Sequence, residues 1–199
     1  SLNQEYVDSI SVYYRHNRLV VSSTQGVNYL DDPAGKVSIS LDWLERMESA
    51  SDNQLWLGTR PVPINVMSGQ PHADVFTFVT AYPFRAKPAD RLGFVAVHVK
   101  ERAVYQLIRS LESADGGQLA VVDAEGRPIS ASASWNAEGS RIASEIAGDE
   151  RGNGNFIETV AGERSAVTYA SIPTARWKLV QVTPVSQFYE RSAIILRSL

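Results

Sequence analysis

The residues that could carry out chemistry are few and widely separated in this chain. Its three histidines, His16, His72 and His98, are isolated, whereas zinc ligands recur at short helical or hairpin spacing. His98 stands between two valines, which favours a hydrogen-bonded or solvent-facing histidine over a metal ligand. No serine elbow and no ordered Ser, His and Asp set stands out. We therefore expect no catalytic residue, no metal and no cofactor. An exported enzyme remains the least favoured of the three interpretations of function considered for this chain.

One loop superficially resembles a phosphate-binding loop. Residues 31–36 read Asp-Asp-Pro-Ala-Gly-Lys, but the glycine spacing is wrong and no Ser or Thr follows Lys36. The acid pairs Asp31/Asp32 and Asp149/Glu150 fall in predicted loops, where solvation is their simplest role. None of these segments predicts a site.

Composition excludes several classes of function. The chain has 199 residues, a net charge of -3 and no cysteine. Its lysines and arginines are scattered singly, so we expect no nucleic acid partner for this domain. Without cysteine there are no disulfides, thiolate metal sites or cysteine nucleophiles. No apolar run approaches the roughly 18 residues that cross a bilayer.

Hydrophobic periodicity predicts an α+β fold. Alternating or continuous apolar runs predict strands at 9–14, 19–22, 75–82, 91–99, 118–122, 128–132, 154–160, 165–169 and 177–182. Ser40 is placed to cap a helix whose apolar side comprises Leu41, Trp43, Leu44 and Met47. A second helix, 100–113, has its apolar positions at i, i+3, i+4 and i+7, namely Val104, Leu107, Ile108 and Leu111.

Three segments are predicted to lack long regular elements. Residues 26–36 read as a loop, and residues 134–152 as a loop with a short helix near 142–146. Residues 53–70 are predicted to be irregular because Pro61, Pro63 and Gly69 disfavour a long element. The resulting order is two α+β modules, each an antiparallel sheet flanked by helices, joined by the helix 100–113.

Several short motifs in this order carry a resemblance to a known family. In the second half, Asp123-x-x-Gly126 follows a strand, and Trp177-Lys-Leu-Val leads to Pro184. In the first half, Trp56 precedes an apolar strand, and Leu-Gly-Phe-Val-Ala-Val at 92–97 runs into the connecting helix. The chain resembles the double Cache (PAS-like) sensor domains of bacterial receptors, such as sensor histidine kinases and membrane-tethered AraC-type regulators.

The resemblance implies a domain plan. Residues 1–99 would be the membrane-distal module that binds ligand, and 100–113 the connecting helix. Residues 114–184 would be the membrane-proximal module, and 185–199 an exit helix toward a transmembrane segment. Family members begin with a long helix along both modules, of which only residues 2–7 could be the tail here. If that helix was cut off, an apolar stripe should lie exposed beside the sheets.

The resemblance also points to ligand-binding residues in the distal module: Trp56, Arg60, Phe78, Tyr82 and Tyr14, or its neighbour Tyr13. Aromatic rings can stack on sugars or apolar groups, and arginine offers a fork of donors to a carboxylate or to vicinal hydroxyls. Aromatic residues at alternating strand positions are, however, more often simply core residues. An amino-acid-binding subgroup has a Trp-Tyr pair soon after the arginine, but Arg60 is followed by Pro-Val-Pro, so the resemblance does not support an amino-acid ligand. Relatives with AraC-type outputs often lie beside sugar-uptake systems, and by this analogy we favour a sugar.

The sequence thus predicts an extracytoplasmic, membrane-anchored sensor of a small molecule or of an extracellular binding protein, homodimeric in the full receptor. Signal coupling would involve Pro184 and Phe188. The alternatives are a ligand-free interaction or dimerisation module and the sensor of a chemoreceptor.

Overall fold

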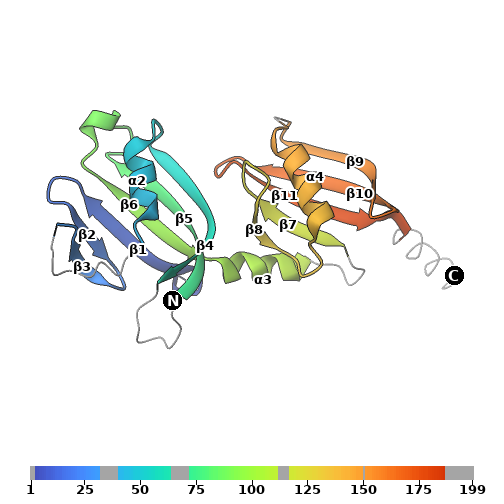
Figure 1. The fold of residues 1–199 in the computed structure, drawn as a ribbon, viewed down its shortest axis with the longest axis horizontal. Helices are drawn as coiled ribbons and strands as arrows, with labels where there is room; N and C mark the ends of the chain where they lie inside the picture. The colour runs from blue at the N-terminus through green and yellow to red at the C-terminus, as the bar shows by residue number, and fades with distance from the viewer. Residues whose placement is uncertain (1–2, 32–39, 64–71, 112–116, 150, 187–199) are drawn as a thin grey trace. The chain divides into compact units, whose positions relative to one another are not determined.

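The fold consists of two separate α+β units in a computed structural model (Figure 1). The structure describes residues 3–31, 40–63, 72–111, 117–149 and 151–186. Unit 1 comprises Ser1–Ala103 and unit 2 comprises Val104–Leu199. Each contains one antiparallel sheet, so the predicted α+β class with two sheets is confirmed. None of the helices in the described part of the chain has the length and apolar character of a membrane span.

Unit 1 is built on a six-stranded sheet, which we call sheet A, in the order β3-β2-β1-β6-β5-β4. Its strands are β1 (Val7–Tyr14), β2 (Leu19–Ser22), β3 (Gly26–Tyr29), β4 (Gln54–Pro63), β5 (His72–Tyr82) and β6 (Gly93–Lys100). Among the described residues, its helices are α1 (Asn3–Tyr6), α2 (Asp42–Ser49) and the short 3-10 helix η2 (Pro88–Asp90). All its strand pairs are antiparallel, as expected from hairpin connections.

The core of unit 1 lies between α2 and one face of sheet A. Trp43 and Met47 of α2 are fully buried, and they belong to one apolar cluster with Tyr13, Phe94 and Val79 of the sheet. The rings of Tyr13 and Phe94 stack, with centroids 6.0 Å apart. Burying such aromatic side chains is worth roughly 1.5–3 kcal/mol each. This packing decides which face of sheet A is inside.

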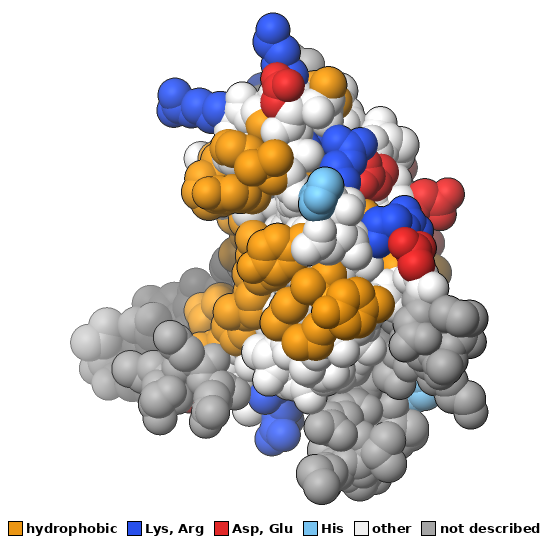
Figure 2. Space-filling model, turned by 90° about the vertical axis from the view of Figure 1, so that its left-hand side faces the viewer, with side chains coloured by type: hydrophobic (Ala, Val, Ile, Leu, Met, Phe, Trp, Pro, Cys, Tyr) orange, Lys and Arg blue, Asp and Glu red, His pale blue; other side chains and the backbone are white. Residues whose placement is uncertain are grey.

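The opposite face of sheet A is apolar but largely uncovered by the described residues. Because strand side chains alternate, this face receives Ile10, Tyr14, Val27, Tyr29 and Tyr82, all of them exposed. Figure 2 shows apolar side chains gathered in patches on the side of unit 1 that it draws. The expectation of an exposed apolar stripe is therefore confirmed for sheet A.

The prediction that residues 53–70 are irregular is wrong for their first half. β4 is a ten-residue strand that contains Pro61 and Pro63. It lies at the edge of sheet A and pairs only with β5, with a register shift between Leu57 and Arg60. An edge strand tolerates proline because no second neighbour requires the missing N–H. β3 was likewise missed, as a short strand inside a predicted loop.

The ends of α2 are held differently from the prediction. Ser40 does not cap the helix, because Leu41 occupies the N-cap without a side-chain bond and the Ser40 hydroxyl donates to Asp42. At the other end, the buried Arg91 guanidinium donates five hydrogen bonds of 2.9–3.1 Å. Its acceptors are the Asn53 side chain and the carbonyls of Met47, Ala50, Ser51 and Asp52.

We expect Arg91→Met to destabilise unit 1 by about 3 kcal/mol, because the substitution leaves several buried carbonyl groups without a hydrogen-bond donor. Arg91→Lys should restore only part of the loss, since an ammonium has three donors instead of five. Urea unfolding measures both. The matched control is Arg18→Met, whose ion pair with Asp31 is solvent-exposed and should contribute little to stability. Equal losses at both arginines would contradict the assigned role of Arg91.

Unit 2 contains the five-stranded sheet B, in the order β8-β7-β11-β10-β9. Its strands are β7 (Gln118–Val122), β8 (Pro128–Ala131), β9 (Asn153–Val160), β10 (Glu163–Ile172) and β11 (Trp177–Pro184). These agree with the predicted strands, and the two hairpins of this region are confirmed. The exit helix was predicted over 185–199, and residues 187–199 lie outside the described residues.

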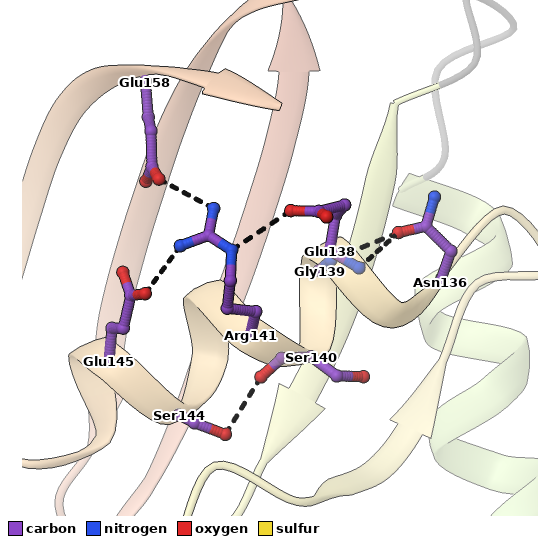
Figure 3. Close-up of polar contacts among 8 residues, drawn as sticks. All are labelled: Asn136, Glu138, Gly139, Ser140, Arg141, Ser144, Glu145 and Glu158. Carbon is purple, nitrogen blue, oxygen red and sulfur yellow. Dashed lines mark hydrogen bonds and ion pairs between the residues drawn. The ribbon is translucent and has the colours of Figure 1, made fainter. Parts of the chain in front are cut away.

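Helix α4 (Ala137–Ala147) covers one face of sheet B and is longer than the predicted 142–146 turn. Its N-cap is Asn136, whose side-chain oxygen accepts from the backbone N–H groups of Glu138 and Gly139 (Figure 3). Apolar residues of α4, including Ile142 and Ile146, pack on the valines of β10 and β11.

The Asp123-x-x-Gly126 motif is a turn fitted against α4. The Asp123 carboxylate accepts from the backbone N–H groups of Glu125 and Arg127 at 3.0 and 2.8 Å. Gly126 has φ of +79°, and a Cβ there would lie 2.6 Å from the Cα of Ser144 in α4. Only glycine satisfies both constraints.

Helix α3 (Glu101–Leu111) corresponds to the predicted helix 100–113. Of its predicted apolar stripe, Ile108 is buried, while Leu107 and Leu111 are exposed. The boundary between the two units falls after Ala103, inside this helix. Its role in joining and coupling the modules stays a prediction.

Candidate ligand-binding site in unit 1

The α2-side face of sheet A changes from apolar to polar toward the end where β1 begins and β6 ends. Five polar side chains are buried there, which we call the polar strip: Ser9, Ser11, Ser22, Thr77 and His98. The strand register brings them together, with Ser11 opposite Ser22, and His98 opposite both Ser9 and Thr77. Buried polar groups cost free energy unless they are hydrogen-bonded, so a polar strip in a core requires polar partners.

Arg60 of β4 lies at the edge of this strip and links it to α2. Its Nη1 donates to the Thr77 hydroxyl at 2.9 Å, and that hydroxyl lies 2.8 Å from Nδ1 of His98. Its Nε and Nη2 donate to the two carboxylate oxygens of Asp42, in the first turn of α2. This bidentate geometry is the strongest arrangement for an arginine and a carboxylate.

The Arg60–Asp42 pair lies at the boundary with solvent. The side chains are 20% and 41% exposed, respectively, whereas the Thr77 and His98 side chains behind them are buried. Among the described residues, the bonds of Arg60 use three of the five N–H donors that a guanidinium carries. The remaining two can serve an acceptor that approaches from solvent.

The charges of this cluster follow from burial and hydrogen bonding. Burial, and then the positive charge of Arg60, lowers the pKa of His98 to about 4, so this imidazole is neutral at neutral pH. Burial alone would raise the pKa of Asp42, but the hydrogen bonds from Arg60 and Ser40 outweigh it and lower that pKa. The cluster is therefore an ion pair beside a neutral histidine and a hydroxyl, and it carries no net charge.

A neutral His98 makes the stability of the protein pH-dependent. The pKa is about 4 in the folded protein and 6.5 ordinarily, so the unfolded chain binds the proton first as pH falls. The free energy of unfolding should be undiminished above pH 6.5 and fall between pH 6.5 and 4, by up to about 3 kcal/mol. His98→Asn keeps an acceptor toward Thr77. In urea unfolding, the free energy of unfolding of this variant should not fall with pH across that range. An unchanged slope in the variant would exclude His98 as its origin.

The structure separates the residues that the sequence analysis selected. Trp56 and Phe78 contact each other, with ring centroids 4.7 Å apart, on the face of sheet A opposite α2. Tyr14 and Tyr82 lie on that same face, on either side of Gly93. Arg60 instead bonds with Thr77 on the α2 side. One pocket cannot be lined by both groups, because the sheet lies between them.

The remaining candidates have simple placements. Tyr13 is buried in the core against Phe94. Pro184 is the last residue of β11 and pairs with Ser165 of β10. Phe188 lies outside the described residues. Ligand contact and signal coupling by these residues stay predictions.

Sequence reasoning missed Asp42, Thr77 and the serines of the strip. A signal was present in β1, where Ser9, Ser11 and Tyr13 alternate with Ile10 and Val12. Ile10 and Val12 are the more apolar of these two alternating groups, yet the group that contains Ser9 and Ser11 faces the core. Among the described residues, no group of three or more His, Cys, Asp or Glu side chains could hold a metal ion.

Comparison with known proteins defines the fold. No protein-family model and no curated protein matches the chain. Several solved structures do. The extracellular domain of rpHK1S-Z16, described as a histidine kinase, matches with a TM-score of 0.62 at 13% identity, over 94% of this chain and 76% of that one. The chain has the fold of a Cache sensor domain.

Two chemoreceptor domains match as well. The ligand-binding domain of PctB from Pseudomonas aeruginosa PAO1, in complex with L-Arg, has a TM-score of 0.60 at 12% identity, over 100% of this chain and 74% of that one. That of CtaA from Pseudomonas fluorescens, in complex with L-isoleucine, has a TM-score of 0.55 at 12% identity, over 96% and 74%. The Cache resemblance seen in the sequence is thus confirmed as a statement about fold.

Proposed function

We propose that this chain is the extracytoplasmic ligand-sensing domain of a bacterial membrane receptor, either a sensor histidine kinase or a chemoreceptor. The Cache fold supports it, since the matching structures are extracellular kinase domains and chemoreceptor ligand-binding domains. The observation that carries the proposal is the polar strip of unit 1 with Arg60 at its edge. The role is binding and signalling rather than catalysis. We leave out an AraC-type output, because the matching structures named here come from the other two classes.

Binding at the strip can produce a signal only if the ligand prefers one of two arrangements. Asp42 offers such a choice, because its carboxylate occupies two of the donors of Arg60 and belongs to the first turn of α2. A ligand acceptor that takes over these donors would release α2 from β4. A ligand that bonds to both Arg60 and Asp42 would instead hold the two together. In either case α2 is the element that responds.

The ligand that we propose is a small polar molecule. The expectation of a sugar depended on analogy with relatives that have AraC-type outputs, and the matching structures do not support that output. The aromatic rings that could stack on a sugar also lie on the face of sheet A opposite Arg60. PctB and CtaA were solved with amino acids, which carry the carboxylate that a guanidinium binds well. Amino acids and organic acids therefore precede sugars in the panel to be tested.

A thermal-shift screen of this chain tests the proposal. A ligand at about 100 times its Kd should stabilise unit 1 by roughly 2.7 kcal/mol, a shift of several degrees. Arg60→Ala should abolish the shift, and Trp56→Ala, on the opposite face of the same strand, should leave it unchanged. Asp42→Asn separates the two mechanisms. The substitution should increase the affinity for a ligand that competes with Asp42 for Arg60, and decrease the affinity for a ligand that bonds to Asp42. A shift lost in Trp56→Ala but kept in Arg60→Ala would move the site to the other face.

A second candidate function is a ligand-free interaction module. The observation that favours it is the exposed apolar face of sheet A, which carries Ile10, Tyr14, Val27, Tyr29 and Tyr82. Exposed apolar surface of this kind often marks a protein interface. No shift with any member of the panel would favour this function over ligand sensing.

A further inference from the structure

The four edge strands of the two sheets are protected to different degrees. An exposed edge can pair with another chain, and proteins usually prevent this with short strands, prolines or bulges. β3 and β8 have four residues each, and β8 begins with Pro128 and has a register shift. β4 is long but contains Pro61, Pro63 and a register shift. Three of the four edges therefore resist pairing.

β9 has none of these protections. It spans eight residues, Asn153–Val160, without proline, lysine or arginine, and it pairs with β10 without a register shift. Phe156 and Ile157 are exposed at its middle, Ile157 to 58%. Its one charge, Glu158, bonds to Arg141 at 2.7 Å, in a network with Glu138 and Glu145 (Figure 3). Within the described part of the chain, β9 therefore has no unpaired charged side chain that would disfavour pairing with another strand.

The hairpin fixes which backbone groups of β9 face outward. A two-residue turn, Ala161-Gly162, has positive φ at both positions and is closed by the pair Val160 and Glu163. The closing pair of such a hairpin is hydrogen-bonded, and bonded and non-bonded pairs alternate along an antiparallel ladder. The backbone N–H and C=O groups of Asn155, Ile157 and Thr159 are thus directed away from β10.

We propose that β9 pairs antiparallel with β9 of a second copy of this chain, so that sheet B continues across a two-fold axis at Ile157. In this register Ile157 meets its own copy, Asn155 lies opposite Thr159, and Phe156 lies opposite Glu158. The pair of Ile157 residues is apolar, the pair of Asn155 and Thr159 is polar, and no two carboxylates lie opposite each other, which would be destabilising. The contact is self-complementary, as a two-fold dimer requires. It is independent of the ligand site in unit 1.

Sedimentation equilibrium of this chain over an about hundredfold range of concentration tests the proposal. The wild-type chain should dimerise, and Ile157→Pro should be monomeric with an unchanged circular dichroism spectrum, since its lost N–H faces away from β10. Ile157→Val, which keeps the N–H, is the matched control and should still dimerise. If the proline variant does not fold, Ile157→Lys replaces it, because two lysines would meet at the axis. A wild-type monomer at every concentration would overturn the proposal.

Hydrogen exchange distinguishes this dimer from one formed elsewhere. The amides of Asn155, Ile157 and Thr159 should become protected as the dimer forms. The amides of Phe156 and Glu158, already bonded to β10, should be protected in monomer and dimer alike. A dimer in which the first three amides exchange freely would show that another surface, such as the apolar face of sheet A, holds the copies together.

Discussion

The packing of α2 on only part of one face of sheet A is the constraint on which the rest of unit 1 depends. Trp43 and Met47 bury the apolar half of that face, and an eight-residue helix is too short to cover the remainder. So short a helix has little stability of its own and needs tertiary contacts. Arg91 supplies them at its C-terminal end and Asp42 at its N-terminal end. The polar strip begins where the cover of Trp43 and Met47 ends.

The two units use the same layers for different purposes. In unit 2 most of the sheet face under α4 is apolar: Val122, Val167, Val180 and Val182 form one core with Ile142. The buried Lys178 on this face donates to the Ile146 carbonyl at the end of α4, so it has a structural role. In unit 1 the corresponding face gives way to serine, threonine and histidine. Valine at those positions would pack a drier and more stable core. Polar residues that weaken a core without a structural return can be explained by binding, and this is why our proposal concerns unit 1 rather than unit 2.

Most of the fold could be predicted from the sequence, because its signals are local. Period-two alternation located β1 and β5, a nearly continuous apolar run located β6, and turn residues located the hairpin between β7 and β8. β4 was missed because proline disfavours strands in general, and only the tertiary position of β4 at an edge removes the objection. α4 was underestimated because its polar residues form ion pairs on the outer surface, so its sequence reads as a loop.

The site could not be predicted in the same way, because it depends on which face of each strand turns inward. Arg60 and Trp56 are four residues apart, which would place both on one face of a regular strand. The register shift between Leu57 and Arg60 reverses this alternation and sends the guanidinium to the α2 side. Thr77 and His98 join it from two other strands, through pairings between residues 21 positions apart in the chain. A one-residue irregularity at an edge strand thus decides whether Arg60 meets aromatic rings or a carboxylate, and with it the class of ligand that we propose for unit 1.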